Sequence, residues 1–116
     1  MKFLLDANFL TIPGEFKVDI FTELFHFGKP ELFTLDLVVK ELETIKSKHT
    51  RLGLQLLKKH KVKILKAVGV TDKEIERIAK ENNFVVCTQD KKLISDLQKS
   101  GIKVVYLRQK KYLEIK

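Results

Sequence analysis

The sequence contains a single cysteine, Cys87, and no apolar run that approaches the roughly 20 residues needed to span a bilayer. One cysteine excludes an intramolecular disulfide and a cysteine-rich zinc site, and it favours a reducing location, for which we expect the cytoplasm. We expect neither membrane association nor a signal peptide, because Asp6 interrupts the first apolar run almost at once.

Several familiar catalytic motifs are also missing from the sequence. There is no P-loop, no G-x-G-x-x-G fingerprint and no H-E-x-x-H pair, and His26, His49 and His60 are scattered. Cys87 lies inside the apolar stretch FVVCT, which favours a small buried side chain over a nucleophile. No catalytic set of these kinds therefore competes with the acidic residues described below.

Positive charge is what the sequence has in excess. Among its 116 residues, 23 are Lys or Arg and 15 are Asp or Glu, which gives a formal net charge of +8. A hydrophobic content of 44% with 33% charged residues is typical of a globular protein, and the length predicts one domain over residues 1–116. The charge indicates a polyanionic partner, nucleic acid first, although a basic bias of the whole proteome would give the same number.

Strand-like and helix-like patterns alternate along the chain, without an internal repeat or a linker. This alternation predicts an α/β fold: a three-layer α/β/α sandwich with a mainly parallel central sheet and right-handed crossovers. In such sheets the functional crevice lies beyond the carboxyl ends of the strands. The expected strands are 2–6, 31–35, 61–65, 84–88 and 102–107, and the expected helices are 17–27, 37–46, 48–60, 72–82 and 91–100.

Four acidic residues stand where that crevice is expected. Asp6 directly follows the apolar run of the first strand, and Asp90 lies just past FVVCT. Asp72 opens one predicted helix, and Glu41 lies one turn inside another. If the strands are parallel, all four side chains can project toward one end of the sheet.

Asp72, Asp90 and the nearby Asp36 also have an ordinary explanation as residues that stabilise the start of a helix. Thr71 and Glu74 have the T-x-x-E spacing of a capping box, in which case Asp72 only complements the helix dipole. Asp90 is a candidate N-cap for the helix that begins at residue 91, and Asp36 is a candidate N-cap for the helix 37–46.

Asp6 lacks such an explanation in the sequence pattern, because no amphipathic helix is predicted to begin directly after it. Glu41, in contrast, is also compatible with a solvated surface position. Crowded carboxylates repel one another, and a hard divalent cation relieves that repulsion. One or two Mg²⁺ or Mn²⁺ ions in such a site can activate a water and stabilise the leaving oxygen of a phosphodiester.

Four stretches resemble, in order and spacing, the acidic motifs of PIN-domain ribonucleases: LLDANFL (4–10), VVKELE (38–43), TDKEIERIA (71–79) and VVCTQDKKL (85–93). This resemblance covers essentially the whole chain. It implies a Rossmann-like sandwich that cleaves single-stranded RNA with Mg²⁺ or Mn²⁺. By the same resemblance, the metal-binding acids are Asp6, Glu41, Asp72 and Asp90, and the small polar residues that orient them are Asn8 and Thr88.

Two branches of that family compete. LDANFL with VDIF, the lysine-rich segment 46–65 and the tail VVYLRQKKYLEI are similar to the ribosomal-RNA processing PIN proteins of archaea and eukaryotes. VapC toxins are similarly short and share the acids, but they often carry a second acid where this chain has Lys92. The resemblance therefore favours RNA processing. The expected partner is RNA, with pre-ribosomal particles and a homodimer as candidate assemblies.

Basic residues form two clusters that are candidate contacts to the RNA backbone. The ordinary explanation is a solvated helix face, and the rival functional class is an inactive module that binds RNA without cutting it. Tyr106 and Tyr112 are candidates for stacking on bases, with strand packing as the alternative. The first cluster contains Lys46, Lys48, Arg51, Lys58, Lys59, Lys61 and Lys63, and the second contains Arg108, Lys110 and Lys111.

Overall fold

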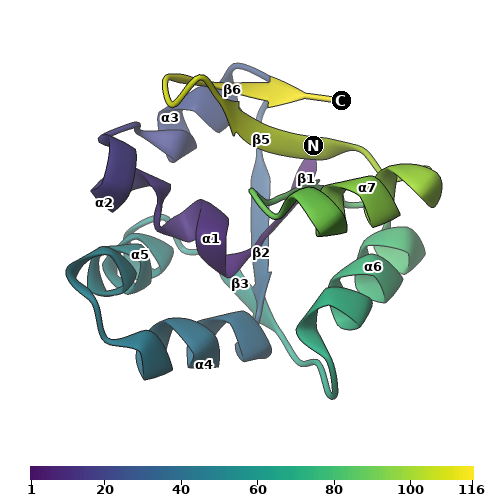
Figure 1. The fold of residues 1–116 in the computed structure, drawn as a ribbon, viewed down its shortest axis with the longest axis horizontal. Helices are drawn as coiled ribbons and strands as arrows, with labels where there is room; N and C mark the ends of the chain where they lie inside the picture. Colours follow the sequence, from purple (N-terminus) through teal and green to yellow (C-terminus); the bar gives the residue numbers. More distant parts are fainter.

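A computed structural model that describes all residues 1–116 contains one six-stranded sheet, in the order β3-β2-β1-β4-β5-β6 (Figure 1). Every neighbouring pair of strands is parallel except β5 and β6. The α/β class and the mainly parallel sheet are therefore as predicted. The strands are β1 Lys2–Leu5, β2 Glu31–Leu35, β3 Lys63–Leu65, β4 Val85–Cys87, β5 Val104–Arg108 and β6 Tyr112–Ile115.

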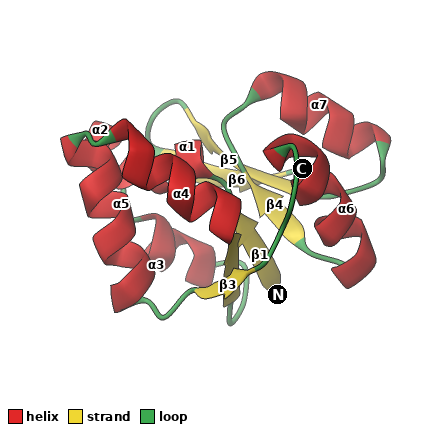
Figure 2. Ribbon diagram, turned by 90° about the horizontal axis from the view of Figure 1, so that it is seen from below, coloured by secondary structure: helices red, strands yellow, loops and turns green.

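Helices cover the sheet on both sides, which confirms the three layers of the predicted sandwich. Figure 2 shows α2 to α5 gathered on one side of the strands, and α6 and α7 on the other. No helix is long and apolar enough to cross a membrane. The helices are α1 Ala7–Leu10, α2 Ile12–Phe16, α3 Ile20–Phe25, α4 Asp36–Ile45, α5 Lys48–Lys59, α6 Thr71–Asn82 and α7 Lys91–Lys99.

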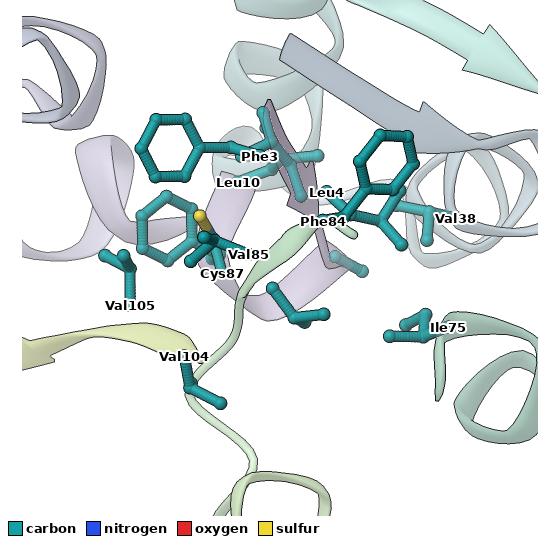
Figure 3. Close-up of a cluster of buried hydrophobic side chains, with 14 of the residues drawn as sticks. Phe3, Leu4, Leu10, Val38, Ile75, Phe84, Val85, Cys87, Val104 and Val105 are labelled. Atoms are coloured by element: carbon teal, nitrogen blue, oxygen red, sulfur yellow. The ribbon is translucent and has the colours of Figure 1, made fainter. Parts of the chain in front are cut away.

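The central strand β1 forms the middle of the hydrophobic core. Phe3, Leu4 and Leu5 are fully buried, because β1 has a strand on each edge and helices on each face. Figure 3 shows side chains from β1, β4, β5 and the helices packed around it. Cys87 in β4 is also fully buried, and this burial raises the pKa of its thiol well above the ordinary value. The cysteine is therefore a packing residue, as expected.

The segment between β1 and β2 differs from the prediction. Two short helices, α1 and α2, precede residue 17, and the helix expected over 17–27 is confined to Ile20–Phe25. Lys17 adopts a left-handed conformation (φ 56°) that ends α2, and the side chain of Asp19 then caps α3 by accepting from Thr22 N. Helices of one turn have no readable 3.6-residue period, which is why the sequence does not predict them.

The last strand, β6, is also absent from the prediction. Lys111 N donates to Arg108 O at 3.1 Å, and the two residues between them, Gln109 and Lys110, have φ of 54° and 57°. Positive φ at both central positions is the signature of a type I′ hairpin turn, which usually contains Asn-Gly or Asp-Gly. This chain forms the turn with neither pair, so the sequence carries no clear hairpin signal.

The strand order creates one switch point, between β1 and β4. The chain leaves β1 toward β2 and leaves β4 toward β5, so that successive connections diverge from these two neighbouring strands. In open parallel sheets, ligands bind in the crevice formed by such a divergence at the carboxyl ends. Asp6 N donates to Cys87 O at 3.0 Å across this point, which places Asp6 and Thr88 side by side.

Candidate active site

Asp6 lies at the centre of the switch point and is buried, with 7% of its surface exposed. Its Oδ1 accepts from Ala7 N at 2.8 Å, and its Oδ2 accepts from Thr88 Oγ1 at 2.8 Å. Asp6 is therefore the N-cap of α1. The expectation that no helix begins directly after Asp6 is wrong, because α1, although only one turn long, starts at Ala7.

Thr88 and Asn8, the two predicted supporting residues, join the ends of β1 and β4 through hydrogen bonds. Thr88 Oγ1 donates to Asp6 Oδ2, lies 3.2 Å from Asn8 Oδ1, and accepts from Asp90 N at 3.2 Å. Asn8 Oδ1 also accepts from Gln89 N at 3.0 Å. A continuous set of hydrogen bonds therefore runs from the backbone of Asp90 to the carboxylate of Asp6.

The environment of Asp6 opposes its ionisation. Burial raises its pKa from 3.8 to about 6, against the hydrogen bonds from Thr88 and Ala7, which lower it. The negative charges of Glu41 and Asp72 raise it further. These charges act on Asp6 from α4 and α6, elements far apart in sequence, so the structure brings three of the predicted acids toward one region.

Asp90 is the N-cap of α7, which confirms the structural role considered for it. Its Oδ1 accepts from both Lys92 N, at 3.0 Å, and Leu93 N, at 3.2 Å. The cap uses only one carboxylate oxygen, so Oδ2 lies outside it. A cap role and a metal-binding role are therefore compatible for this side chain.

Asp72 lies in the first turn of α6, but the predicted capping box is wrong. The N-cap is Val70, so that Thr71 is the first helical residue. Glu74 instead accepts from Val68 N at 3.1 Å and binds Arg77 through both of its oxygens. These contacts fix the loop between the carboxyl end of β3 and α6, which begins one residue before Asp72.

Asp36 supports the same loop and is not the cap expected from the sequence. It is the first residue of α4, the N-cap is Leu35, and no side chain caps this helix. Asp36 Oδ1 accepts from Ala67 N at 3.0 Å, which ties the exit of β3 to the start of α4. Two acids that the sequence assigned to helix ends thus hold the approach to Asp72 in place.

Charges on α7 act on Asp72. Its pKa is raised first by burial and then by the charge of Asp90; Lys92 opposes the shift, and Asp96 adds to it. Asp96 is not among the acids predicted from the sequence. No spacing in the sequence indicates it, because residues six apart lie about 120° from each other around a helix and so on different faces.

The predicted metal-binding acids lie around one region, but they do not converge closely enough to bind one ion together. Glu41 is exposed on α4, whereas Asp6 is buried. No three histidine, cysteine or acidic side chains come close enough together to ligate one ion directly. The donor set nevertheless fits Mg²⁺ or Mn²⁺, because Mg²⁺ in particular is commonly held by one or two carboxylates and keeps several waters.

The structure divides the first basic cluster into two groups. Lys46, Lys48 and Arg51 follow the end of α4, and Lys46 is about 8 Å beyond Glu41 along the helix axis. In contrast, α5 leads into the amino end of β3. The C-terminal group therefore precedes or begins β3, away from the carboxyl end of that strand, and the structure does not bring it together with Lys46, Lys48 and Arg51. This group contains Lys58, Lys59, Lys61 and Lys63.

Comparison with known proteins agrees with this architecture. A family model described as a PIN-like domain matches residues 3–110, and the chain belongs to this family. Ribonuclease VapC4 of Methanocaldococcus jannaschii is 34% identical over 125 residues, which cover 98% of this chain and 95% of that protein.

Two solved structures share the fold. The PIN domain endonuclease Utp24 superposes with a TM-score of 0.87 at 22% identity, over 99% of this chain and 90% of that chain. A domain of a functionally unknown protein from Methanocaldococcus jannaschii gives a TM-score of 0.65 at 21% identity, over 92% and 91% of the two chains.

The raised pKa of Asp6 predicts how stability changes with pH in the metal-free protein. The folded state binds more protons than the unfolded state between the two pKa values, so the free energy of unfolding falls as pH rises from about 4 through about 6. Asp6→Asn removes this cost, which is on the order of 3 kcal/mol. The stability of Asp6→Asn relative to the parent should therefore increase between pH 4 and pH 7.

Asp19→Asn is the matched control, because Asp19 caps α3 and its pKa is lowered by hydrogen bonds from Thr22. The pH dependence that Asp19 contributes to the free energy of unfolding has the opposite sign. Asp19 stabilises the protein above its unfolded pKa, and this contribution is lost as pH falls. Urea unfolding in EDTA at several pH values measures both variants. A difference between Asp6→Asn and the parent that does not change with pH would contradict the account.

Proposed function

We propose that the protein is a divalent-metal-dependent endoribonuclease that cleaves single-stranded RNA. The observation that carries this proposal is the acidic region at the switch point of a strongly basic protein. Asp6 is buried there, and the negative charges of Glu41 and Asp72 act on it, although the chain as a whole carries a net charge of +8. Membership of the PIN-like family and the similarity to ribonuclease VapC4 support the same activity.

Asp6, Glu41, Asp72 and Asp90 would hold the metal, as hard oxygen donors do. When bound, Mg²⁺ or Mn²⁺ supplies an activated water and stabilises the charge on the leaving oxygen. The chain itself contributes orientation. Thr88 and the backbone of Ala7 each hold one oxygen of Asp6, and the α7 cap holds one oxygen of Asp90.

The basic surface is proposed to bring the RNA backbone to this acidic region, which alone would repel it. Lys46, Lys48 and Arg51 are exposed and follow the helix that carries Glu41. We assign the backbone contacts to these three residues rather than to the lysines at the amino edge.

For the biological role we propose ribosomal-RNA processing, in the cytoplasm and in association with pre-ribosomal particles. The resemblance of the motifs to the processing branch supports it, and so does Lys92, which places a cation beside Asp72 where VapC toxins often have an acid. A VapC-type toxin, acting as a homodimer, is the second candidate, favoured by the 34% identity to ribonuclease VapC4. An antitoxin gene immediately upstream would reverse this ranking.

The first test uses Asp90→Asn, because asparagine caps a helix about as well as aspartate and the fold should survive. Cleavage of single-stranded RNA in Mn²⁺ should fall at least a hundredfold, since the variant keeps the cap and loses only the charge. EDTA should abolish cleavage by the parent.

Asp19→Asn is the control, since it makes the same change at a helix cap outside the acidic region. It should cleave RNA at the parental rate. Equal rates for Asp90→Asn and Asp19→Asn, in protein free of contaminating nuclease, would remove Asp90 from the site. RNA binding without any cleavage by the parent would favour the inactive binding module.

A second test compares the two basic groups. Replacing Lys46, Lys48 and Arg51 together with alanine should weaken RNA binding and flatten its dependence on salt. The reason is that binding with fewer phosphate contacts releases fewer counterions from the RNA. The matched triple replacement of Lys58, Lys59 and Lys61 removes the same charge at the other edge of the sheet. It should leave the salt slope nearly unchanged. Equal slopes in the two triple variants would contradict the assignment.

A further inference from the structure

A pocket of about 440 Å³ lies between α7 and the β5–β6 hairpin. Lys91, Ser95 and Gln98 line it from α7, at the spacing that places side chains on one face of a helix. Tyr106 lines it from β5. Its volume is within the range of small-ligand pockets, about 300–1,000 Å³.

This pocket is continuous with the acidic region through Gln89, the residue between Thr88 and Asp90. Gln89 lines the pocket, accepts from Leu107 N through Oε1 at 2.6 Å, and donates to Leu107 O through Nε2 at 3.4 Å. These bonds join the end of β4 to β5. Gln89 and Lys91, which flank Asp90 in the sequence, both line the pocket, so the pocket borders the acidic region at Asp90.

The lining combines cations with an aromatic ring and contains no acidic residue. Arg108 is already bound to Glu114 at 2.8 and 3.0 Å, so Lys91 and Lys116 are the cations free to bind an anion. Lys116 Nζ lies over the Tyr106 ring, 4.6 Å from its centre, so that face is covered by a flexible charged side chain that a stacking base would displace. Aromatic faces beside lysines are the usual platforms for single-stranded bases.

We propose that this pocket binds one nucleotide of the RNA strand next to the cleaved phosphodiester. The base stacks on Tyr106, and the phosphate lies between Lys91 and Lys116. Ser95 and Gln98 offer hydroxyl and amide groups to the edge of the base. This inference rests on the proposed function, because it names a position of the same substrate.

A larger pocket, of about 630 Å³, does not serve this role. It contains Lys80 and Lys103 and is lined by the amino ends of β1, β4 and the loop before β5. It therefore lies at the opposite edge of the sheet and shares no residue with the acidic region. Its lysines provide matched controls.

The experiment measures binding of a fluorescent single-stranded RNA in EDTA, which separates binding from metal-dependent cleavage. Tyr106→Leu should weaken binding about tenfold, because it removes the ring and keeps an apolar side chain. Tyr106→Phe should bind like the parent. Tyr112→Leu, the same change at a tyrosine outside the pocket, should also bind like the parent. Thermal unfolding of each variant verifies that it folds.

A scan with abasic nucleotides then identifies the bound base. One abasic position should weaken binding to the parent about tenfold and should have no effect on Tyr106→Leu, since both changes remove the same contact. Lys116→Ala should weaken binding severalfold more than Lys103→Ala.

Two results would overturn the proposal: equal binding by Tyr106→Leu and Tyr112→Leu, or an abasic penalty that persists in Tyr106→Leu. Failure of the proposed function has a different signature. In that case the parent does not cleave RNA in Mn²⁺, whereas the effects of Tyr106 and Lys116 on binding in EDTA persist.

Discussion

The buried carboxylate of Asp6 is the constraint on which the carboxyl edge of this protein depends. An ionised carboxylate in a protein interior is costly unless it is hydrogen-bonded, paired or bound to a metal. Here Thr88 and Ala7 each satisfy one oxygen, but no basic side chain pairs with the carboxylate, and burial raises its pKa to about 6. The fold therefore maintains an electrostatic cost at the switch point, and a divalent cation would relieve it.

The surrounding contacts explain how separate elements maintain that arrangement. Thr88 bridges β1 and β4, while Asp36 and Glu74 fix the loop that leads to Asp72. Asp36 and Glu74 each accept from a backbone N–H, and Thr88 donates its hydroxyl to Asp6, so the sheet, the helix ends and a neutral side chain position the acids without contacts among the acids themselves. Such positioning lets like charges stay near one another in the absence of metal.

Much of this could be predicted from the sequence, because an apolar run that ends in an acid indicates a buried strand leading to a crevice. This logic correctly predicted the parallel strands β1 to β5, and the position of Asp90 directly before a helix correctly predicted its cap role. It failed where one local pattern permits two structures. The T-x-x-E spacing does not distinguish a capping box from a glutamate bound to a loop. The single turn of helix after Asp6 is too short to show a 3.6-residue period in the sequence. The division of the lysines depends on strand direction, and Asp96 depends on the packing of α7; neither is a local property of the sequence.

The central claim is that acids from four elements form one cation-binding region at the switch point. Paramagnetic broadening of backbone amide NMR signals by substoichiometric Mn²⁺ tests it directly, because broadening falls steeply with distance from the ion. The account predicts that the amides of Ala7, Asp72 and Gln89 broaden first, while those of Lys80 and Lys103 at the amino edge stay sharp. Broadening that is uniform over the surface, or that is centred at the amino edge, would contradict it.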